Sequence, residues 1–182
     1  MKLKKMMLRS MAVLCVLCLA TGCSKEQQEE KKEEKKVVSN CSIVECMKKI
    51  EATNTIEEIN DIIGFESTTD AMISSDPMWK FDSKNWISFK SYSENSITIQ
   101  ATIDKESLKN EDIKLPLSSD LQKDLNNGSF TYEELAEKIG GEGTLTSISE
   151  NSRIYTWVDK SSQRLSATFN NKSGKCTIAS YR

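Results

Sequence analysis

The chain has 182 residues, a formal net charge of −2 and no histidine. The lack of histidine excludes Ser-His-Asp and Cys-His nucleophiles and histidine-ligated zinc, and the small net charge, without a basic stretch interleaved with aromatic residues, argues against a nucleic-acid-binding module. The sequence also shows no Gly-rich phosphate loop and no metal-binding loop, so we expect no cofactor, no metal ion and no catalytic residues.

The first 22 residues predict a lipoprotein signal peptide. Basic residues precede the apolar run "MAVLCVLCLA", which is too short to span a bilayer but has the length of a signal-peptide core. The run leads into "LATGC", which resembles the bacterial lipobox. This resemblance implies that Cys23 carries the lipid, palmitate included, and that the protein is anchored to the outer side of the cell membrane without spanning it. The alternative is an ordinary secretory signal that is cut near Cys23.

Residues 23–39 predict a charged linker behind the lipidated cysteine. The stretch "SKEQQEEKKEEKK" contains five Glu, five Lys and no apolar residue, so it cannot bury a core. Like charges recur four residues apart, which is unfavourable on a helix. We therefore expect a solvated stalk between the membrane and a folded part that begins at residue 40.

Three cysteines lie in the expected folded part: Cys41, Cys46 and Cys176. An odd number leaves at least one unpaired or paired between molecules, and export would permit a disulfide. Cys41–Cys46 and Cys46–Cys176 are both candidates. The first requires Cys41 to lie outside the helix that contains Cys46, because residues five apart on one helix point in different directions. Burial of Cys46 and Cys176 as small apolar groups also remains open.

Two similar stretches, "NTIEEINDIIG" and "FTYEELAEKIGG", predict two helices that lie 76 residues apart. Each begins with a Thr-x-x-Glu capping box, at Thr55 and at Thr131, in which the hydroxyl and the carboxylate each bond the other residue's amide. Each ends at a glycine, Gly64 or Gly140, which can adopt the left-handed conformation that stops a helix. An amphipathic stretch precedes each one, so the sequence predicts two helix pairs.

After each helix pair, the apolar residues recur with a period of two, which indicates half-buried strands. The predicted strands lie within residues 85–92, 95–104, 153–160, 163–171 and 175–182. Trp79, which follows Pro77, is expected in a loop, either as a binding anchor or as a lid over the core. The predicted fold is α+β, with two tandem units at residues 40–112 and 113–182. In each unit a helix-loop-helix packs on its own antiparallel sheet of three or four strands.

The second unit resembles repeats of the β-lactamase inhibitor protein family and its lipoprotein relatives. The residues that carry the resemblance are the Thr131 capping box, the turn Gly140-Gly141-Glu142-Gly143-Thr144, the Tyr155-x-Trp157 pair and Phe169 before a turn. The first unit departs from this pattern, since Phe65 replaces the second glycine and Phe89 stands where Trp157 stands. Similar helix-helix-sheet units occur in small outer-membrane lipoproteins of the SmpA/OmlA type. A shared fold does not fix a function.

The resemblance implies that the sheet face opposite the helices is concave and grips a partner protein. If Ile87 and Phe89 are core, alternation turns the neighbouring residues of each strand outward. The predicted partner-binding residues are Trp86, Lys90, Tyr92, Gln100, Thr168 and Tyr181. The other residues predicted to face outward are Ser88, Thr98, Thr102, Thr156, Val158, Ser166 and Thr177, whereas Trp157 is predicted to be core.

This face would suit recognition, because aromatic rings act as anchors and hydroxyls as adaptable hydrogen-bonding groups. Threonine on these strands is also consistent with β-propensity alone, and Trp86 with closing a strand end. The favoured function is a surface-anchored module that binds an extracytoplasmic protein. The alternatives are an inhibitor of a β-lactamase or cell-wall enzyme, and a cell-wall hydrolase that uses paired carboxylates.

Overall fold

The computed structural model describes residues 38–70, 74–93, 96–115 and 119–182. The predicted signal peptide, Cys23 and nearly all of the charged linker lie outside these residues. None of the helices within the described ranges is long and apolar enough to cross a bilayer.

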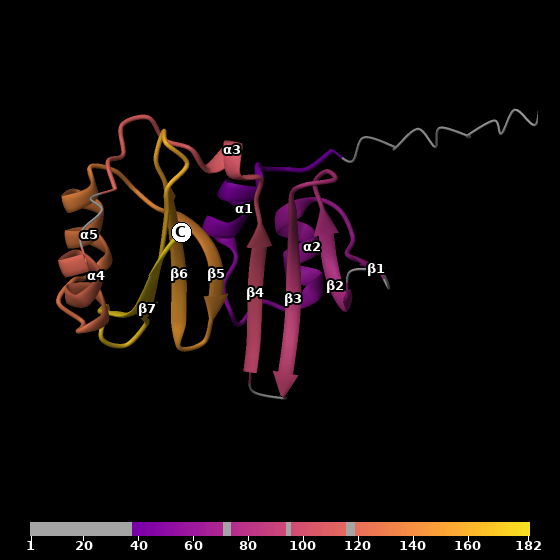
Figure 1. Ribbon diagram of the computed structural model, residues 1–182. Helices are drawn as coiled ribbons and strands as arrows, with labels where there is room; N and C mark the ends of the chain where they lie inside the picture. Colours follow the sequence, from indigo (N-terminus) through magenta and orange to yellow (C-terminus); the bar gives the residue numbers. More distant parts are fainter. Residues whose placement is uncertain (1–37, 71–73, 94–95, 116–118) are drawn as a thin grey trace, which may run out of the picture. The chain divides into compact units, whose positions relative to one another are not determined.

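The described residues form two helices and four strands, then a short helix, and then again two helices and four strands (Figure 1). The first set is α1 (Ile43–Lys49), α2 (Ile56–Ile63), β1 (Thr68–Asp70), β2 (Ser74–Lys80), β3 (Trp86–Ser93) and β4 (Ser96–Thr102). The short helix is α3 (Lys105–Leu108), and the second set is α4 (Ser119–Asn126), α5 (Tyr132–Ile139), β5 (Thr144–Ser149), β6 (Ser152–Val158), β7 (Arg164–Asn170) and β8 (Cys176–Tyr181).

All eight strands belong to one antiparallel sheet, and they lie in it in chain order. The strands β4 and β5 pair directly, with Thr98 opposite Ser149 and Gln100 opposite Ser147. The prediction of two units, each with a separate small sheet, is therefore wrong. Two separate sheets would leave β4 and β5 as edges with unpaired N–H and C=O groups, whereas their pairing satisfies those groups and joins the halves.

The helices α2 and α5 begin and end where the sequence predicts. The Thr55 hydroxyl accepts from the Glu58 amide at 3.2 Å, and the Glu58 carboxylate accepts from the Thr55 amide at 2.9 Å. The box at Thr131 and Glu134 has the same two bonds, at 3.3 and 2.8 Å. The helices end at Gly64 and Gly140, with φ of 94° and 90°. A third capping box, between Ser42 and Glu45, begins α1.

The helices α1, α2, α4 and α5 pack on one face of the sheet and form two clusters of buried side chains. In the first core, Met47 of α1 and Ile59 of α2 pack with strand residues as far along as Ile148 of β5. In the second core, α4 and α5 pack on β6, β7 and β8 around Trp157. Tyr155 contacts both clusters. The boundary between the cores thus falls after β5, although the sequence assigned β5 to the second unit.

Trp79 lies in strand β2 and is fully buried in the first core, so its predicted place in a loop is wrong. Its indole N–H donates to the side-chain oxygen of Asn60 on α2 at 2.7 Å. Pro77 suggested a loop because proline cannot donate to a strand ladder. On the side away from β3, β2 pairs with the short edge strand β1, and the register of this pair shifts between Thr68 and Asp70. A proline is tolerated near such an irregular edge.

Cys41 and Cys46 form a disulfide whose Cα atoms lie 5.6 Å apart. Cys41 precedes Ser42, the N-cap of α1, and so lies outside the helix as this pairing requires. Cys176 is a free, buried thiol in the second core, so the Cys46–Cys176 alternative is wrong. Burial raises the pKa of the Cys176 thiol.

Candidate functional site

The face of the sheet opposite the helices carries most of the residues that the sequence singled out. Ile87 and Ile99 lie in the first core, and Leu165 lies in the second. Because strand side chains alternate between faces, the residues on either side of them lie on the opposite face. We call this the outer face and define it by Trp86, Ser88, Lys90, Thr98, Gln100, Thr102, Ser147, Ile154, Thr156, Val158, Arg164, Ser166, Thr168, Ile178, Ser180 and Arg182.

One row of directly opposed residues crosses the outer face. In the order of the strands from β2 to β8, this central row consists of Met78, Ser88, Gln100, Ser147, Ile154, Thr168 and Ile178. Neighbouring strands lie about 4.8 Å apart, so Gln100 and Thr168 are roughly 14 Å apart. Both are therefore within reach of a single protein surface.

The other predicted residues of β3 lie beside this row. Trp86 is half-buried at the start of the strand, opposite Lys80 and Thr102. Lys90 lies opposite Thr98, also on the outer face. Tyr92 belongs to β3, but its side chain is outside the described part of the structure.

Tyr181 does not lie on the outer face, contrary to the prediction. It lies opposite Leu165 and packs against the second core, and burial raises the pKa of its hydroxyl. The reason is a shift of register in β8, where Phe169 pairs with Cys176 but Thr168 pairs with Ile178. The extra residue, Thr177, forms a bulge, and a slip of one residue moves every later side chain to the other face.

The same bulge places Ile178 on the outer face, where the side chain is 64% exposed. Alternation counted from buried Cys176 would place Ile178 on the helix-covered face, so the sequence alone does not identify it as part of the outer face. Ile154 lies two strands away in the central row, with Thr168 between them. The outer face thus has an exposed apolar group among hydroxyl side chains.

A chain of hydroxyl groups runs across β5, β6 and β7 on the outer face. The Thr146 hydroxyl donates to the Ile154 carbonyl at 3.3 Å, and contacts the Thr156 hydroxyl at 3.1 Å. The Thr156 hydroxyl contacts that of Ser166 at 3.1 Å. In each of these two hydroxyl pairs, either oxygen can be the donor. Ser166 in turn accepts from Nε of Arg164 at 3.2 Å.

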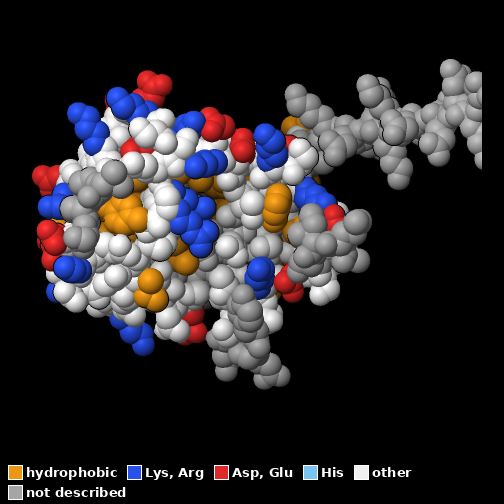
Figure 2. All heavy atoms as spheres, in the orientation of Figure 1, with side chains coloured by type: hydrophobic (Ala, Val, Ile, Leu, Met, Phe, Trp, Pro, Cys, Tyr) orange, Lys and Arg blue, Asp and Glu red, His pale blue; other side chains and the backbone are white. Residues whose placement is uncertain are grey.

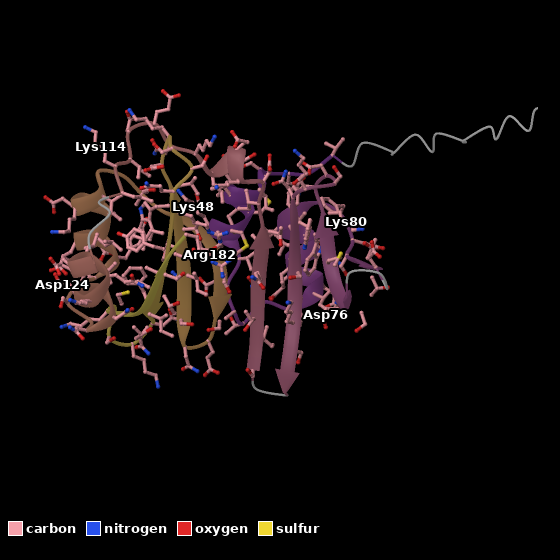
Figure 3. The ribbon with its side chains drawn as sticks, in the orientation of Figure 1. Lys48, Asp76, Lys80, Lys114, Asp124 and Arg182 are labelled. Atoms are coloured by element: carbon pink, nitrogen blue, oxygen red, sulfur yellow. A yellow bond between two sulfur atoms is a disulfide. The ribbon has the colours of Figure 1, made fainter. Side chains whose placement is uncertain are left out.

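Two arginines lie side by side where this hydroxyl chain ends. The amide of Arg164 donates to the Arg182 carbonyl at 2.8 Å, and the amide of Arg182 donates to the Arg164 carbonyl at 2.9 Å. With Ser166 and Ser180, which also lie opposite each other, they line a cavity of about 140 Å³. Arg182 lies near the middle of the view in Figure 3, where Figure 2 shows a group of Lys and Arg side chains.

No protein-family model, characterised protein or solved structure matches this chain. Nothing in these comparisons identifies it as a relative of the β-lactamase inhibitor protein family or of the SmpA/OmlA-type lipoproteins. Within the described ranges, no group of three or more Cys, Asp or Glu residues is placed to hold a metal ion. The assignment of the outer face as the candidate site therefore rests on the arrangement of its residues alone.

The alternation of side chains along β7 indicates that Arg164 faces outward, toward the cavity that it lines with Ser166, Ser180 and Arg182. In "RLSATFN", Arg164 has the same parity as Ser166 and Thr168, which were both predicted to face outward. Arg164 was missed because the predicted recognition face was built from aromatic and hydroxyl residues. Arg182 was missed because its face depends on the bulge at Thr177.

Proposed function

We propose that the protein is a lipid-anchored extracytoplasmic protein that binds another protein through the outer face. The observation that carries this proposal is Ile178, which is 64% exposed in the central row, next to polar Thr168. Protein interfaces combine a few apolar anchors with a polar, adaptable rim. Ile178 and Ile154 supply the anchors, and Gln100, Thr168 and Lys90 supply the rim.

The membrane anchor is supported by the sequence around Cys23 and by the disulfide. A short apolar run followed by "LATGC" is typical of a lipidated cysteine, and the charged linker behind it would hold the folded part away from the membrane. The Cys41–Cys46 disulfide is consistent with export, because such bonds persist mainly outside the cytoplasm.

Binding fits the outer face better than catalysis does. The residues that define it are hydroxyl, amide, aromatic, apolar and basic side chains, and at its β2 edge Lys80, opposite Trp86, pairs with Asp70. Paired carboxylates, which a histidine-free hydrolase would need, are therefore not among them. The arrangement favours recognition of a surface.

Photo-cross-linking on intact cells tests the binding surface. A photoreactive residue at Gln100 of the full chain should give a discrete adduct with an envelope protein, whereas one at Glu137, exposed on α5, should not. Ile178→Gln should reduce the Gln100 adduct at least about tenfold, while the fold is retained because the side chain is largely exposed. Equal adducts from both positions, or an adduct indifferent to Ile178→Gln, would contradict the proposal.

The same cells test the anchor. The full chain should incorporate labelled palmitate and fractionate with membranes, and Cys23→Ala should abolish both, because the remaining chain would have no attached lipid. A Cys23→Ala form that stays with the membrane would show that another feature holds it there.

A further inference from the structure

We propose that the cavity formed by Arg164, Ser166, Ser180 and Arg182 binds a carboxylate, supplied by an acidic side chain of the protein that the outer face recognises. This inference rests on the proposed function and specifies the chemistry of the partner. The four residues come from β7, β8 and the residue that follows β8, and all lie on the outer face.

The first argument is the placement of two like charges. The reciprocal backbone bonds of 2.8 and 2.9 Å make Arg164 and Arg182 a directly opposed pair. Like charges directly opposite each other on neighbouring strands destabilise a sheet. Within the described part of the chain, neither guanidinium lies within 4.0 Å of an Asp or Glu carboxylate. A bound anion would relieve this repulsion.

The second argument is that the hydroxyl chain holds Arg164 in place. Nε of Arg164 donates to Ser166 at 3.2 Å, and Ser166 is fixed by its bond to Thr156, which is only 1% exposed. Arg164 therefore keeps its two terminal nitrogens, with their four N–H donors, available for another acceptor. A positioned guanidinium loses less conformational freedom on binding than a freely moving one.

The third argument is the match between the cavity and a carboxylate. Arginine presents a planar fork of donors that fits the two oxygens of a carboxylate, and an ionised carboxylate is purely an acceptor. The cavity has a volume of about 140 Å³, several times the minimum that one water molecule needs. It is thus large enough for a carboxylate but not for a whole folded segment.

The neighbouring apolar group indicates that the carboxylate belongs to a protein. Ser180 lies two residues from Ile178 along β8, and Ser166 lies two residues from Thr168 along β7. Two residues of a strand span about 6.7 Å, so one partner segment with an acidic and an apolar side chain can reach both the cavity and Ile178. A free inorganic anion would use the cavity alone.

Titration of purified full-length protein in detergent micelles tests the cavity itself, with sodium acetate as the probe. Acetate should shift the amide signals of Ser166 and Ser180 and the Nε signal of Arg164 saturably in ¹H–¹⁵N spectra, and sodium chloride at equal ionic strength should not. Arg164→Gln should weaken acetate binding at least about tenfold, and Arg164→Lys should weaken it less. The matched control is Arg153→Gln, since Arg153 lies opposite core residue Phe169 and off the outer face. Acetate shifts that do not saturate, or that persist in Arg164→Gln, overturn the inference.

Sodium phosphate, titrated in the same way, distinguishes the source of the anion. Acetate should bind at least as well as phosphate. If phosphate binds more than about tenfold better, the cavity is a phosphate site and the assignment to a carboxylate is overturned.

The cross-link from Gln100 tests whether the carboxylate is the partner's. In folded protein, Arg164→Gln should reduce that adduct at least about tenfold, and Arg153→Gln should leave it unchanged. An undiminished adduct in Arg164→Gln, with acetate binding lost, overturns the inference but leaves the proposed function standing. If the unaltered chain gives no adduct at all, the proposed function fails and the partner assignment fails with it, even where acetate binds.

Discussion

At the scale of single residues, Trp157 shows why the turn after α5 contains so many glycines. Its indole N–H donates to the Gly141 carbonyl at 2.9 Å, and its ring is 1% exposed in the second core. A Cβ atom built on Gly143 would lie 2.5 Å from a carbon of that ring. Glycine is thus needed at position 143 because the backbone passes directly against the indole. The sequence contained the motif, but only the packing gives its reason.

We expect Gly143→Ala to destabilise the protein by about 1–3 kcal/mol, the usual cost of overpacking a core. Urea unfolding would measure the loss, and near-UV circular dichroism should change because the Trp157 ring must move. A useful comparison is Gly174→Ala, where the new Cβ meets no atom within 4 Å but the backbone φ is 67°. That variant should lose about 1–2 kcal/mol through backbone strain alone, with the Trp157 signal unchanged. A Gly143→Ala protein of unaltered stability and spectrum would show that the turn is looser than described.

At the scale of elements, the capping box of α2 links helix stability to pH. The Glu58 carboxylate accepts from the Thr55 amide at 2.9 Å and from the Asn54 side chain at 3.2 Å. These bonds, that of Thr55 foremost, lower the pKa of Glu58. A carboxylate whose pKa is lowered by folding stabilises the folded state above its unfolded pKa of about 4.3, and that contribution is lost as the pH falls through the folded pKa.

Glu58→Gln should therefore be less stable than the unaltered protein at pH 6, and the difference should shrink as the pH falls toward 3. The reason is that glutamine keeps the shape of the cap but carries no charge to be titrated. Urea unfolding at a series of pH values would measure both proteins. A difference that stays constant across this range would mean that the charge of Glu58 does not contribute to the cap.

The helices were predictable because their signals are local, and some strands were not because theirs are interrupted. A capping box and a terminal glycine lie within one short segment, so the start of α2 at Thr55 and its end at Gly64 could be predicted from the sequence. In β5, Leu145 and Ile148 both point into the first core although they lie three residues apart, because the register shifts between Leu145 and Ser147. This bulge removes the period of two that would have indicated a strand.

In the candidate site, too, residues on uninterrupted strands were predictable and residues beyond a bulge were not. Trp86, Lys90, Gln100 and Thr168 lie on uninterrupted stretches of strand, and their faces followed from alternation alone. Tyr181 and Ile178 lie beyond the bulge in β8, so alternation counted along β8 gives the wrong face for both. A bulge depends on pairing with a strand elsewhere in the chain, so a period counted along one strand cannot reveal it.

At the scale of the whole folded part, one sheet connects two cores. The strands β4 and β5 pair across the junction, and Tyr155 packs against both clusters. Two of the buried residues of the first core, Leu145 and Ile148, come from β5, which follows the second helix pair in the chain. The first set of two helices and four strands therefore lacks a complete core of its own. Together with the pairing of β4 and β5, this implies that the two cores unfold together.

Ile148→Ala tests this coupling. Ile148 is 1% exposed, so its truncation should destabilise the protein by about 2–5 kcal/mol through lost burial and the cavity left behind. Because the cores share the sheet, amide signals from β3 in the first core and from β7 in the second should disappear at the same urea concentration. In Ile148→Ala, the urea midpoint of unfolding should fall by the same amount for both strands. Leu165→Ala, made in the second core, should lower the two midpoints together as well. If Ile148→Ala lowers the midpoint of β3 and leaves that of β7 unchanged, the cores fold independently and the pairing of β4 with β5 does not couple them.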